Sequence, residues 1–212
     1  TDGSHPSSKI IDQLLSAMTH RGPDGEGRLT VGGATLVHRR LAIIDLETGA
    51  QPFRDNDGIS LIANGEIYNY RELAAEMPAG TLLTKSDCEL PLHLYKNFGL
   101  DFTTHLRGMY ALAIYDEKKS RLVLARDPFG IKPLYFVEKN GYFAFASEAQ
   151  ALVEAGFSSR TPSVSACKEL LNRQFIGGRC TAFVDVKRVL PGEMLVVEQG
   201  EIVDKRRVNA LP

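Results

Sequence analysis

The sequence is poor in the features that build disulfide scaffolds, metal clusters and membrane spans. Its 212 residues include three cysteines and no tryptophan. Cys88, Cys167 and Cys180 form no CxxC pair, which argues against a disulfide framework and against a zinc cluster. No run of about 20 apolar residues is present, so we expect no membrane-spanning helix. A reducing environment is the simplest interpretation, and we expect a cytoplasmic protein.

Neither sign of charge dominates the sequence, which has 25 Lys and Arg residues against 26 Asp and Glu residues. Without a basic stripe interleaved with aromatic residues, we expect no binding to nucleic acid. The hydrophobic content of 43% is ordinary for a globular protein. No repeat or low-complexity linker interrupts the sequence, so residues 1–212 are predicted to form a single domain.

Helical periodicity alternates with runs of short strands along the chain. Apolar spacing predicts helices over residues 8–18, 71–77, 88–98, 147–155 and 165–174. Short apolar runs predict strands over residues 29–31, 34–37, 41–44, 59–63, 110–115, 121–125, 133–137, 142–146, 194–197 and 202–205. Because tight turns rather than helices join most of these strands, the sheets are expected to be antiparallel and the fold class to be α+β.

Two local patterns resemble functional sites but have simpler explanations. The glycine-rich residues 22–27 lack the GK[ST] ending of a phosphate loop and precede a strand, so a structural loop is favoured over phosphate binding. Cys88 and His93 are five residues apart on a predicted helix, which directs their side chains about 140° apart. We therefore expect Cys88 to be a core residue rather than a nucleophile. No HxxxH or HExxH spacing predicts a metal site.

The polar segment after the predicted strand 59–63 is the strongest local candidate for chemistry. It begins with Asn64, Gly65 and Glu66. An asparagine amide beside a glycine N–H suits stabilisation of an oxyanion, because glycine permits close approach to the backbone. A plain turn between a strand and a helix, in which Asn-Gly is common, explains the same residues. Taken alone, the residues favour the turn.

A series of short motifs follows between residues 20 and 192. They are residues 20–25 (HRGPDG), 38–45 (HRRLAIID), 49–52 (GAQP), 64–70 (NGEIYNY), 86–89 (SDCE), 107–111 (RGMYA), 126–135 (RDPFGIKPLY), 146–148 (ASE) and 190–192 (LPG). In this order they resemble the glutaminase domain of class II glutamine amidotransferases, most closely that of glutamine-dependent asparagine synthetases.

The resemblance implies an N-terminal nucleophile hydrolase fold, a four-layer αββα sandwich with two antiparallel sheets between helical layers. It also implies hydrolysis of the side-chain amide of L-glutamine to glutamate and ammonia, which passes to a synthetase domain in the same full-length chain. Asparagine synthesis is the first expectation for that domain. No cofactor is implied for the glutaminase domain; ATP and Mg²⁺ belong to the synthetase domain, whose SGG-type pyrophosphate loop is absent from this sequence. The resemblance gives no oligomeric state.

The same resemblance assigns roles to individual positions. Asn64 and Gly65 correspond to the oxyanion hole for the tetrahedral intermediate. Arg40 corresponds to the clamp for the α-carboxylate of glutamine, a task that suits a planar fork of donors. A surface ion pair is the local alternative for Arg40.

Four further positions complete the implied glutamine site. Leu41 and Ile43 line the pocket through their backbones. Glu66, mainly by its backbone, and Asp87 receive the α-ammonium group, and Asp87 is the stronger candidate because a cation needs a fixed anion nearby. A helix N-cap is the local alternative for Asp87.

The first residues depart from the family pattern. In the family an N-terminal cysteine attacks the amide and its own α-amino group is the base; that cysteine opens a short apolar strand. Here Thr1 and the polar residues after it precede the first predicted helix, and Thr1 lacks the strand that would position a nucleophile. We therefore expect the chain as given to lack its nucleophile and to be inactive. A non-catalytic glutamine-binding or regulatory domain is the alternative.

Overall fold

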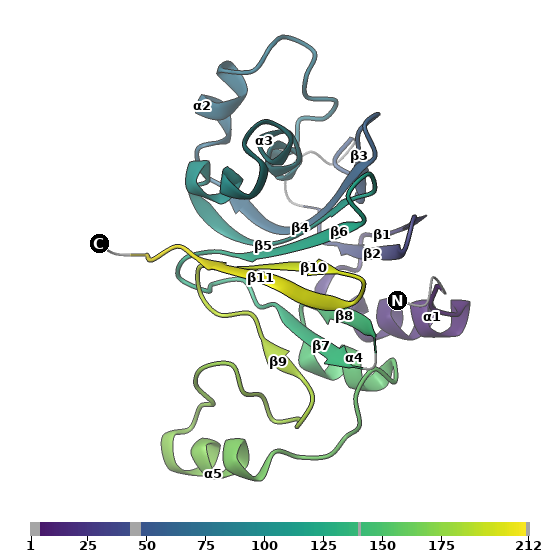
Figure 1. The fold of residues 1–212 in the computed structure, drawn as a ribbon, viewed down its shortest axis with the longest axis vertical. Coiled ribbons are helices and arrows are strands. Elements are labelled where there is room, and N and C mark those ends of the chain that lie inside the picture. The colour runs from purple at the N-terminus through teal and green to yellow at the C-terminus, as the bar shows by residue number, and fades with distance from the viewer. Residues whose placement is uncertain (1–4, 43–47, 140, 211–212) are drawn as a thin grey trace.

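The structure is a computed structural model that describes residues 5–42, 48–139 and 141–210 (Figure 1). The helices are α1 (Ser8–Ala17), α2 (Tyr70–Ala75), α3 (Leu90–Phe98), α4 (Ala149–Glu154) and α5 (Val164–Arg173). The strands are β1 (Gly25–Val31), β2 (Ala34–Arg40), β3 (Phe53–Arg54), β4 (Ile59–Ile67), β5 (Gly108–Asp116), β6 (Arg121–Arg126), β7 (Tyr135–Lys139), β8 (Tyr142–Ala146), β9 (Lys187–Arg188), β10 (Glu193–Glu198) and β11 (Glu201–Arg207). In this described part of the chain, each helix is too short or too polar to cross a bilayer.

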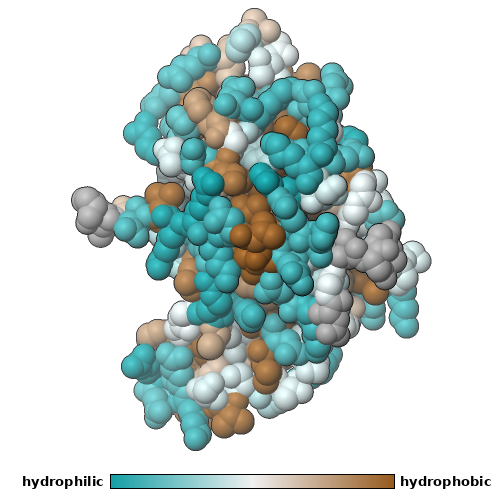
Figure 2. All heavy atoms as spheres, viewed as in Figure 1, coloured by the Kyte–Doolittle hydropathy of each residue, from teal (hydrophilic) through white to brown (hydrophobic). Residues whose placement is uncertain are grey.

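The larger sheet has six antiparallel strands in the order β11-β10-β6-β5-β4-β3. Two of its hairpins, β5–β6 and β10–β11, lie where the sequence predicts them. The edge strand β11 exposes Glu201, Lys205 and Arg206, and charged side chains at an edge discourage pairing with other chains. Figure 2 shows this face as mostly hydrophilic, with a hydrophobic group over β10 and β11.

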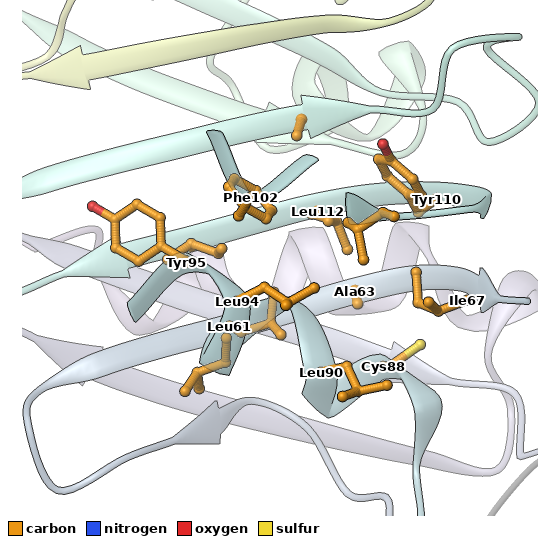
Figure 3. Packing of buried hydrophobic residues seen from close by; sticks show 14 of the residues in the cluster. Leu61, Ala63, Ile67, Cys88, Leu90, Leu94, Tyr95, Phe102, Tyr110 and Leu112 are labelled. Atoms are coloured by element: carbon orange, nitrogen blue, oxygen red, sulfur yellow. The ribbon is translucent and has the colours of Figure 1, made fainter. Parts of the chain in front are cut away.

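Helix α3 and the 3₁₀ segment after it (Gly99–His105) cover one face of the six-stranded sheet. Leu61 and Ile67 of β4 pack in the same buried cluster as side chains of α3 (Figure 3). Phe102 is fully buried there. Gly99 has φ +57° directly after α3, in the left-handed region that glycine adopts readily, and it ends the helix at the predicted residue 98.

The second sheet layer is built in two pieces. One is the β1–β2 hairpin, and the other is the three-stranded sheet β8-β7-β9. A second buried cluster lies between the two layers and contains Ala111, Ala113, Leu124, Leu134, Phe136, Val189 and Leu195. Helix α1 packs against β2 and α4, and α4 packs against β7 and β8. Helices α2 and α3, the two sheet layers, and helices α1 and α4 therefore form four layers, which confirms the predicted αββα sandwich.

Strand β4 is longer than the sequence predicts. It continues through Ile67 and pairs with β5 along its whole length, with Gly65 opposite Tyr110. The turn interpretation of Asn64 and Gly65 is therefore wrong. A Cβ atom on Gly65 would lie 2.1 Å from the carbonyl oxygen of Met109, so the glycine allows β4 and β5 to approach each other. Pairing between distant strands overrides the local turn preference of Asn-Gly.

Two other expectations also need correction. The strand predicted over residues 41–44 is not found at its first two residues. Leu41 and Ala42 have no regular structure, and Leu41 is 56% exposed. Residues 43 and 44 lie outside the described ranges. The predicted loop over residues 22–27 ends early, because Gly25–Val31 forms β1, with Gly25 opposite Arg40 of β2. In that hairpin, pairing with β2 outweighs the weak strand preference of glycine.

Candidate active site

A cavity of about 300 Å³ lies between the two sheet layers. Segments that are distant in sequence line it: β2, β4, β5, the end of β8 and residues 86–88. It brings together the predicted site residues Arg40, Leu41, Asn64, Gly65, Glu66 and Asp87. The remaining one, Ile43, lies outside the described residues. The volume is at the lower end of that of ligand pockets and suits a molecule of amino-acid size.

Strand β4 supplies the amide side of the cavity. Ile62 packs against the cluster between the layers, and alternation along a strand places Asn64 on the same face. The residue opposite Asn64 on β5 is Ala111, whose small side chain leaves space next to the amide. An asparagine amide and the backbone of a glycine thus border one cavity. Such groups can donate hydrogen bonds to an oxygen that becomes negative during a reaction.

Asp87 supplies a buried carboxylate at the end of β4. It is 3% exposed, and its Oδ2 accepts a hydrogen bond from the backbone N–H of Ile67 at 2.7 Å. Burial raises the pKa of this carboxyl above its ordinary value; backbone N–H groups oppose the shift, and the charge of Glu66 adds to it. Two carboxylates in one cavity favour a cationic group of a ligand.

The N-cap alternative for Asp87 is wrong. The short 3₁₀ helix Asp87–Glu89 is capped by Ser86, whose side chain accepts a hydrogen bond from the backbone N–H of Cys88 at 3.3 Å. The carboxylate of Asp87 instead bonds to Ile67 of β4, and the backbone N–H groups of Asp87 and Cys88 add to the bonds that oppose the rise of its pKa.

Arg40 contributes a positive charge to the cavity from the last position of β2. Other basic residues also line the cavity: Arg21, Arg39 and Lys132. Asp24 holds the backbone that follows Arg40: the N–H of Asp24 donates to the carbonyl of Arg40 at 3.0 Å, and the N–H of Ala42 donates to Oδ2 of Asp24 at 2.9 Å. The cavity therefore carries a guanidinium from the second layer and carboxylates from the end of the six-stranded sheet. An amino acid has the matching pair of charges.

His38 lines the cavity, although the sequence motifs predicted no role for this residue. It lies two residues before Arg40, on the same face of β2. Burial lowers the pKa of its imidazole to about 4, the charge of Arg40 acts in the same direction, and a hydrogen bond with the Ala63 backbone opposes both. Its Nδ1 is buried without a hydrogen-bond partner. The sequence did contain one signal for this position: in a strand, a residue two positions before Arg40 lies on the same face as Arg40.

Gln51, from the motif 49–52, supports the same part of β4. Its Nε2 donates to the carbonyl of Ala63 at 3.1 Å, and its Oε1 accepts from the N–H of Ala63 at 2.7 Å. The side chain thus acts like a strand partner directly before Asn64. This contact fixes the backbone that presents the amide.

Cys88 borders the cavity but is poorly suited to be a nucleophile. Its Sγ donates to the carbonyl of Gly65 at 3.5 Å, and the residue is 7% exposed. Burial raises the pKa of the thiol well above its ordinary value, and the carboxylates of Asp87 and Glu66 add to the shift. Because the thiolate is the reactive form, this confirms that Cys88 is a buried structural residue. His93 does not activate it, since its Nε2 bonds to Glu89 Oε1 at 3.1 Å.

Comparison with known proteins adds a family. A family model described as "Glutamine amidotransferase domain" matches residues 1–207. Asparagine synthetase [glutamine-hydrolyzing] 1 of Bacillus subtilis (strain 168) is 37% identical over 206 residues, which are 95% of this chain and 32% of the relative. Asparagine synthetase B [glutamine-hydrolyzing] of Escherichia coli (strain K12) is 42% identical over 156 residues, 72% of this chain and 28% of the relative. The amidase chyE of Penicillium rubens is 38% identical over 204 residues, 91% of this chain and 29% of the relative.

The fold also matches a solved structure. The glutamine phosphoribosylpyrophosphate amidotransferase from B. subtilis, complexed with ADP and GMP, superposes with a TM-score of 0.70 at 23% identity, over 96% of this chain and 47% of that one. At this identity the likeness concerns the fold. The chain spans about a third or less of the length of the curated relatives that it matches.

Proposed function

The chain belongs to the family of glutamine amidotransferase domains, and we propose that its cavity binds L-glutamine for hydrolysis to glutamate and ammonia. One observation carries the proposal. A single cavity of amino-acid size places Arg40, Asn64, Gly65 and Asp87 around one space, although they come from separate segments. The relatives named asparagine synthetase [glutamine-hydrolyzing] support the same substrate.

The charges of the cavity match the ends of glutamine. In the proposed complex the guanidinium of Arg40 binds the α-carboxylate, while Asp87 and Glu66 receive the α-ammonium. The side-chain carbonyl then lies at Asn64 and Gly65. Attack on that carbon makes the oxygen negative, and each donor of such an oxyanion hole is worth about 3–4 kcal/mol of transition-state stabilisation.

The nucleophile of the proposed reaction is an N-terminal cysteine on a strand that precedes residue 1. Its thiolate forms a bond to the amide carbon. The C–N bond then breaks, and ammonia leaves with a proton from the α-ammonium of the same cysteine. Water hydrolyses the resulting thioester, which releases glutamate and restores the thiol. The chain as given is proposed to bind glutamine without hydrolysing it.

The divided second layer supports the proposed strand. A second cavity of about 580 Å³ is lined mainly by apolar residues, including Leu36 of β2 and Phe143 of β8. Both strands are edges of their sheets, and both also line the 300 Å³ cavity. An extended apolar segment between β2 and β8 would fill this space and join the two pieces into one sheet. Its end would then reach the site next to Asn64.

The names of the longer relatives suggest which domain accepts the ammonia. We propose a synthetase domain in the same full-length chain, with asparagine synthesis as its reaction, because asparagine synthetases are prominent among the longer relatives. The proposal needs no cofactor in the glutaminase domain; ATP and Mg²⁺ act in the synthetase domain. We also propose a cytoplasmic location.

The test uses the full-length protein with its natural N-terminus. Ammonia release from L-glutamine is measured with a coupled dehydrogenase assay, and labelling by 6-diazo-5-oxo-norleucine is located by mass spectrometry. We expect turnover and a label on the N-terminal cysteine. Protein that neither binds nor hydrolyses glutamine would refute the proposal. Binding without turnover would instead identify a non-catalytic glutamine-binding domain.

A further inference from the structure

Glu89 is a buried carboxylate beside the site that the proposed reaction does not use. It is 3% exposed, and it is not among the residues that line the 300 Å³ cavity. Burial alone would raise the pKa of this carboxyl, but hydrogen bonds from His93, Leu83 and Thr84 outweigh burial and lower its pKa to about 2. Glu89 is therefore ionised at neutral pH.

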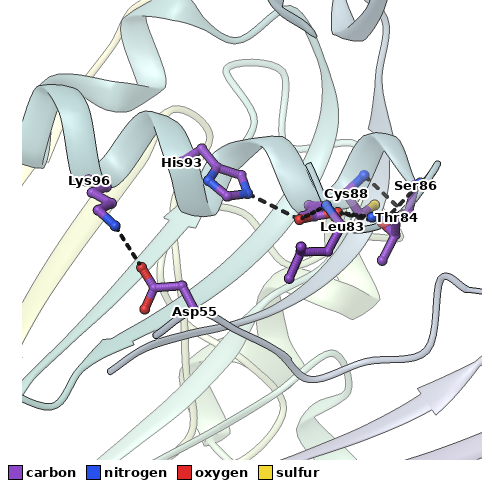
Figure 4. A network of polar contacts seen from close by, with 8 residues as sticks. Asp55, Leu83, Thr84, Ser86, Cys88, His93 and Lys96 are labelled. Carbon is purple, nitrogen blue, oxygen red and sulfur yellow. Dashed lines mark hydrogen bonds and ion pairs between the residues drawn. The ribbon is translucent and has the colours of Figure 1, made fainter. Parts of the chain in front are cut away.

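The carboxylate of Glu89 binds the segment that leads to Asp87; Figure 4 labels Leu83, Thr84 and His93 among the residues that bond to it. Its Oε1 accepts from the backbone N–H of Leu83 at 2.8 Å. Its Oε2 accepts from the backbone N–H of Thr84 at 2.7 Å and from the Thr84 hydroxyl at 2.6 Å. Such charge-assisted bonds are stronger than neutral ones, so Glu89 is the main anchor of residues 83 and 84.

The hydrogen bonds continue from this anchor to the cavity. The N–H of Ser86 donates to Oγ1 of Thr84 at 3.2 Å, and the N–H of Cys88 donates to Oγ of Ser86 at 3.3 Å. Asp87 lies between these two residues and is held from the other side by the N–H of Ile67. These bonds fix the backbone on both sides of Asp87, and the carboxylate of Asp87 interacts in turn with the backbone of Cys88.

We propose that Glu89 is a positioning residue that fixes residues 83–88 and thereby aims Asp87 at the α-ammonium group of the ligand. The inference rests on the proposed function, since it assumes that an amino acid occupies the cavity. If Glu89 has this role, it contributes to the preference of the site for a ligand with an α-ammonium group over the same molecule without that group, and this preference can be measured.

The experiment measures that preference by calorimetry on the full-length protein with two stable ligands, L-glutamate and glutarate. Glutarate differs from L-glutamate only by the missing α-ammonium, so the ratio of the dissociation constants reports that group. We expect the wild-type protein to prefer L-glutamate at least tenfold and Asp87→Asn to remove the preference. Glu89→Gln should lower it at least threefold.

Glu193→Gln is the matched control. Glu193 is 5% exposed, bonds to Arg179 and accepts from the N–H of Leu190 at 2.8 Å, yet it does not line the cavity. This variant should lower the unfolding temperature and leave the ligand preference unchanged. A general loss of stability is thereby separated from misplacement of Asp87.

A milder variant covers the case in which Glu89→Gln fails to fold. Thr84→Val removes the hydroxyl that links Glu89 to Ser86 and should lower the preference about twofold. A preference unchanged in every folded variant of this pair would overturn the positioning role. Wild-type protein that binds neither L-glutamate nor L-glutamine would instead overturn the proposed function.

Discussion

The two sheet layers of the molecule differ in how completely they are built. The six-stranded sheet is continuous, and β4 and β5 pair over nine residues. The second layer is divided into β1–β2 and β8-β7-β9, with cavities of about 300 and 580 Å³ beside its free edges. The two layers therefore carry different parts of the proposed site. The complete layer carries Asn64, Gly65 and Glu66 and bonds to Asp87 through the N–H of Ile67, whereas Arg40 lies on the divided layer, at the end of β2.

Replacing a phenylalanine that packs beside the complete layer and one that lies in the divided layer measures this difference. Phe102 is fully buried under α3, so Phe102→Ala should lower the free energy of unfolding by about 3–5 kcal/mol. Phe143 borders the 580 Å³ cavity and already lacks some contacts, so Phe143→Ala should cost about half as much. Urea unfolding of the chain as given provides both values.

Full-length protein sharpens the comparison. If a strand fills the gap between β2 and β8, the cost of Phe143→Ala rises toward that of Phe102→Ala. Equal costs in the chain as given would show that the second layer is packed as tightly as the first, and the proposed gap would then be wrong.

The next prediction concerns the amide that the complete layer holds. In full-length protein Asn64→Ala should reduce kcat for glutamine hydrolysis by about 10²–10³-fold, with little change in KM, because the donor acts on charge that develops in the transition state. Steady-state kinetics measures both constants.

Asn69→Ala is the control from the same motif. Asn69 bridges the backbones of His105 and Arg107 with bonds of 2.9 Å and lies outside the cavity. It should lower stability and leave kcat near the wild-type value. Similar losses of kcat in both variants would contradict a specific oxyanion role for Asn64.

Loss of Arg40, on the divided layer, should have a smaller effect than loss of Asn64. Arg40→Ala should weaken binding of L-glutamine by about 2 kcal/mol, roughly 30-fold, because a charge-assisted contact to the α-carboxylate is lost. Calorimetry on the chain as given measures it. Arg28→Ala is the control, since Arg28 bonds to Asp12 and Glu26 at the surface. Unchanged affinity in Arg40→Ala would reject the clamp.

Local patterns predicted much of the fold because they reflect local forces. The 3.6-residue spacing placed α3 and the short polar turns placed the β5–β6 hairpin, and the motifs identified residues that share the cavity. The extension of β4 through Gly65 could not be predicted locally, since its cause is the backbone of Met109 on another strand. The burial of His38 likewise depends on contact between the two sheet layers. Leu41 is exposed because the pairing of β2 with β1 ends at Arg40.

The smallest predicted effect concerns His38, the histidine that connects the layers. Its pKa in the folded state is about 4, against an ordinary value of 6.5, so the unfolded chain binds a proton that the folded chain excludes. The free energy of unfolding contributed by this residue is therefore constant above pH 7 and falls as the pH drops from 6.5 toward 4. Between pH 8 and pH 6 the loss should be about 1 kcal/mol.

His38→Gln isolates that contribution. Glutamine keeps a side-chain N–H that can donate to Ala63 but does not titrate, so the variant should lose less stability than the wild-type chain between pH 8 and pH 6. Chemical denaturation at both pH values, compared between the two proteins, measures the difference. Identical pH dependence would mean that the imidazole is protonated equally in the folded and unfolded states. The two layers would then not be closed over this side chain, and burial would not lower its pKa.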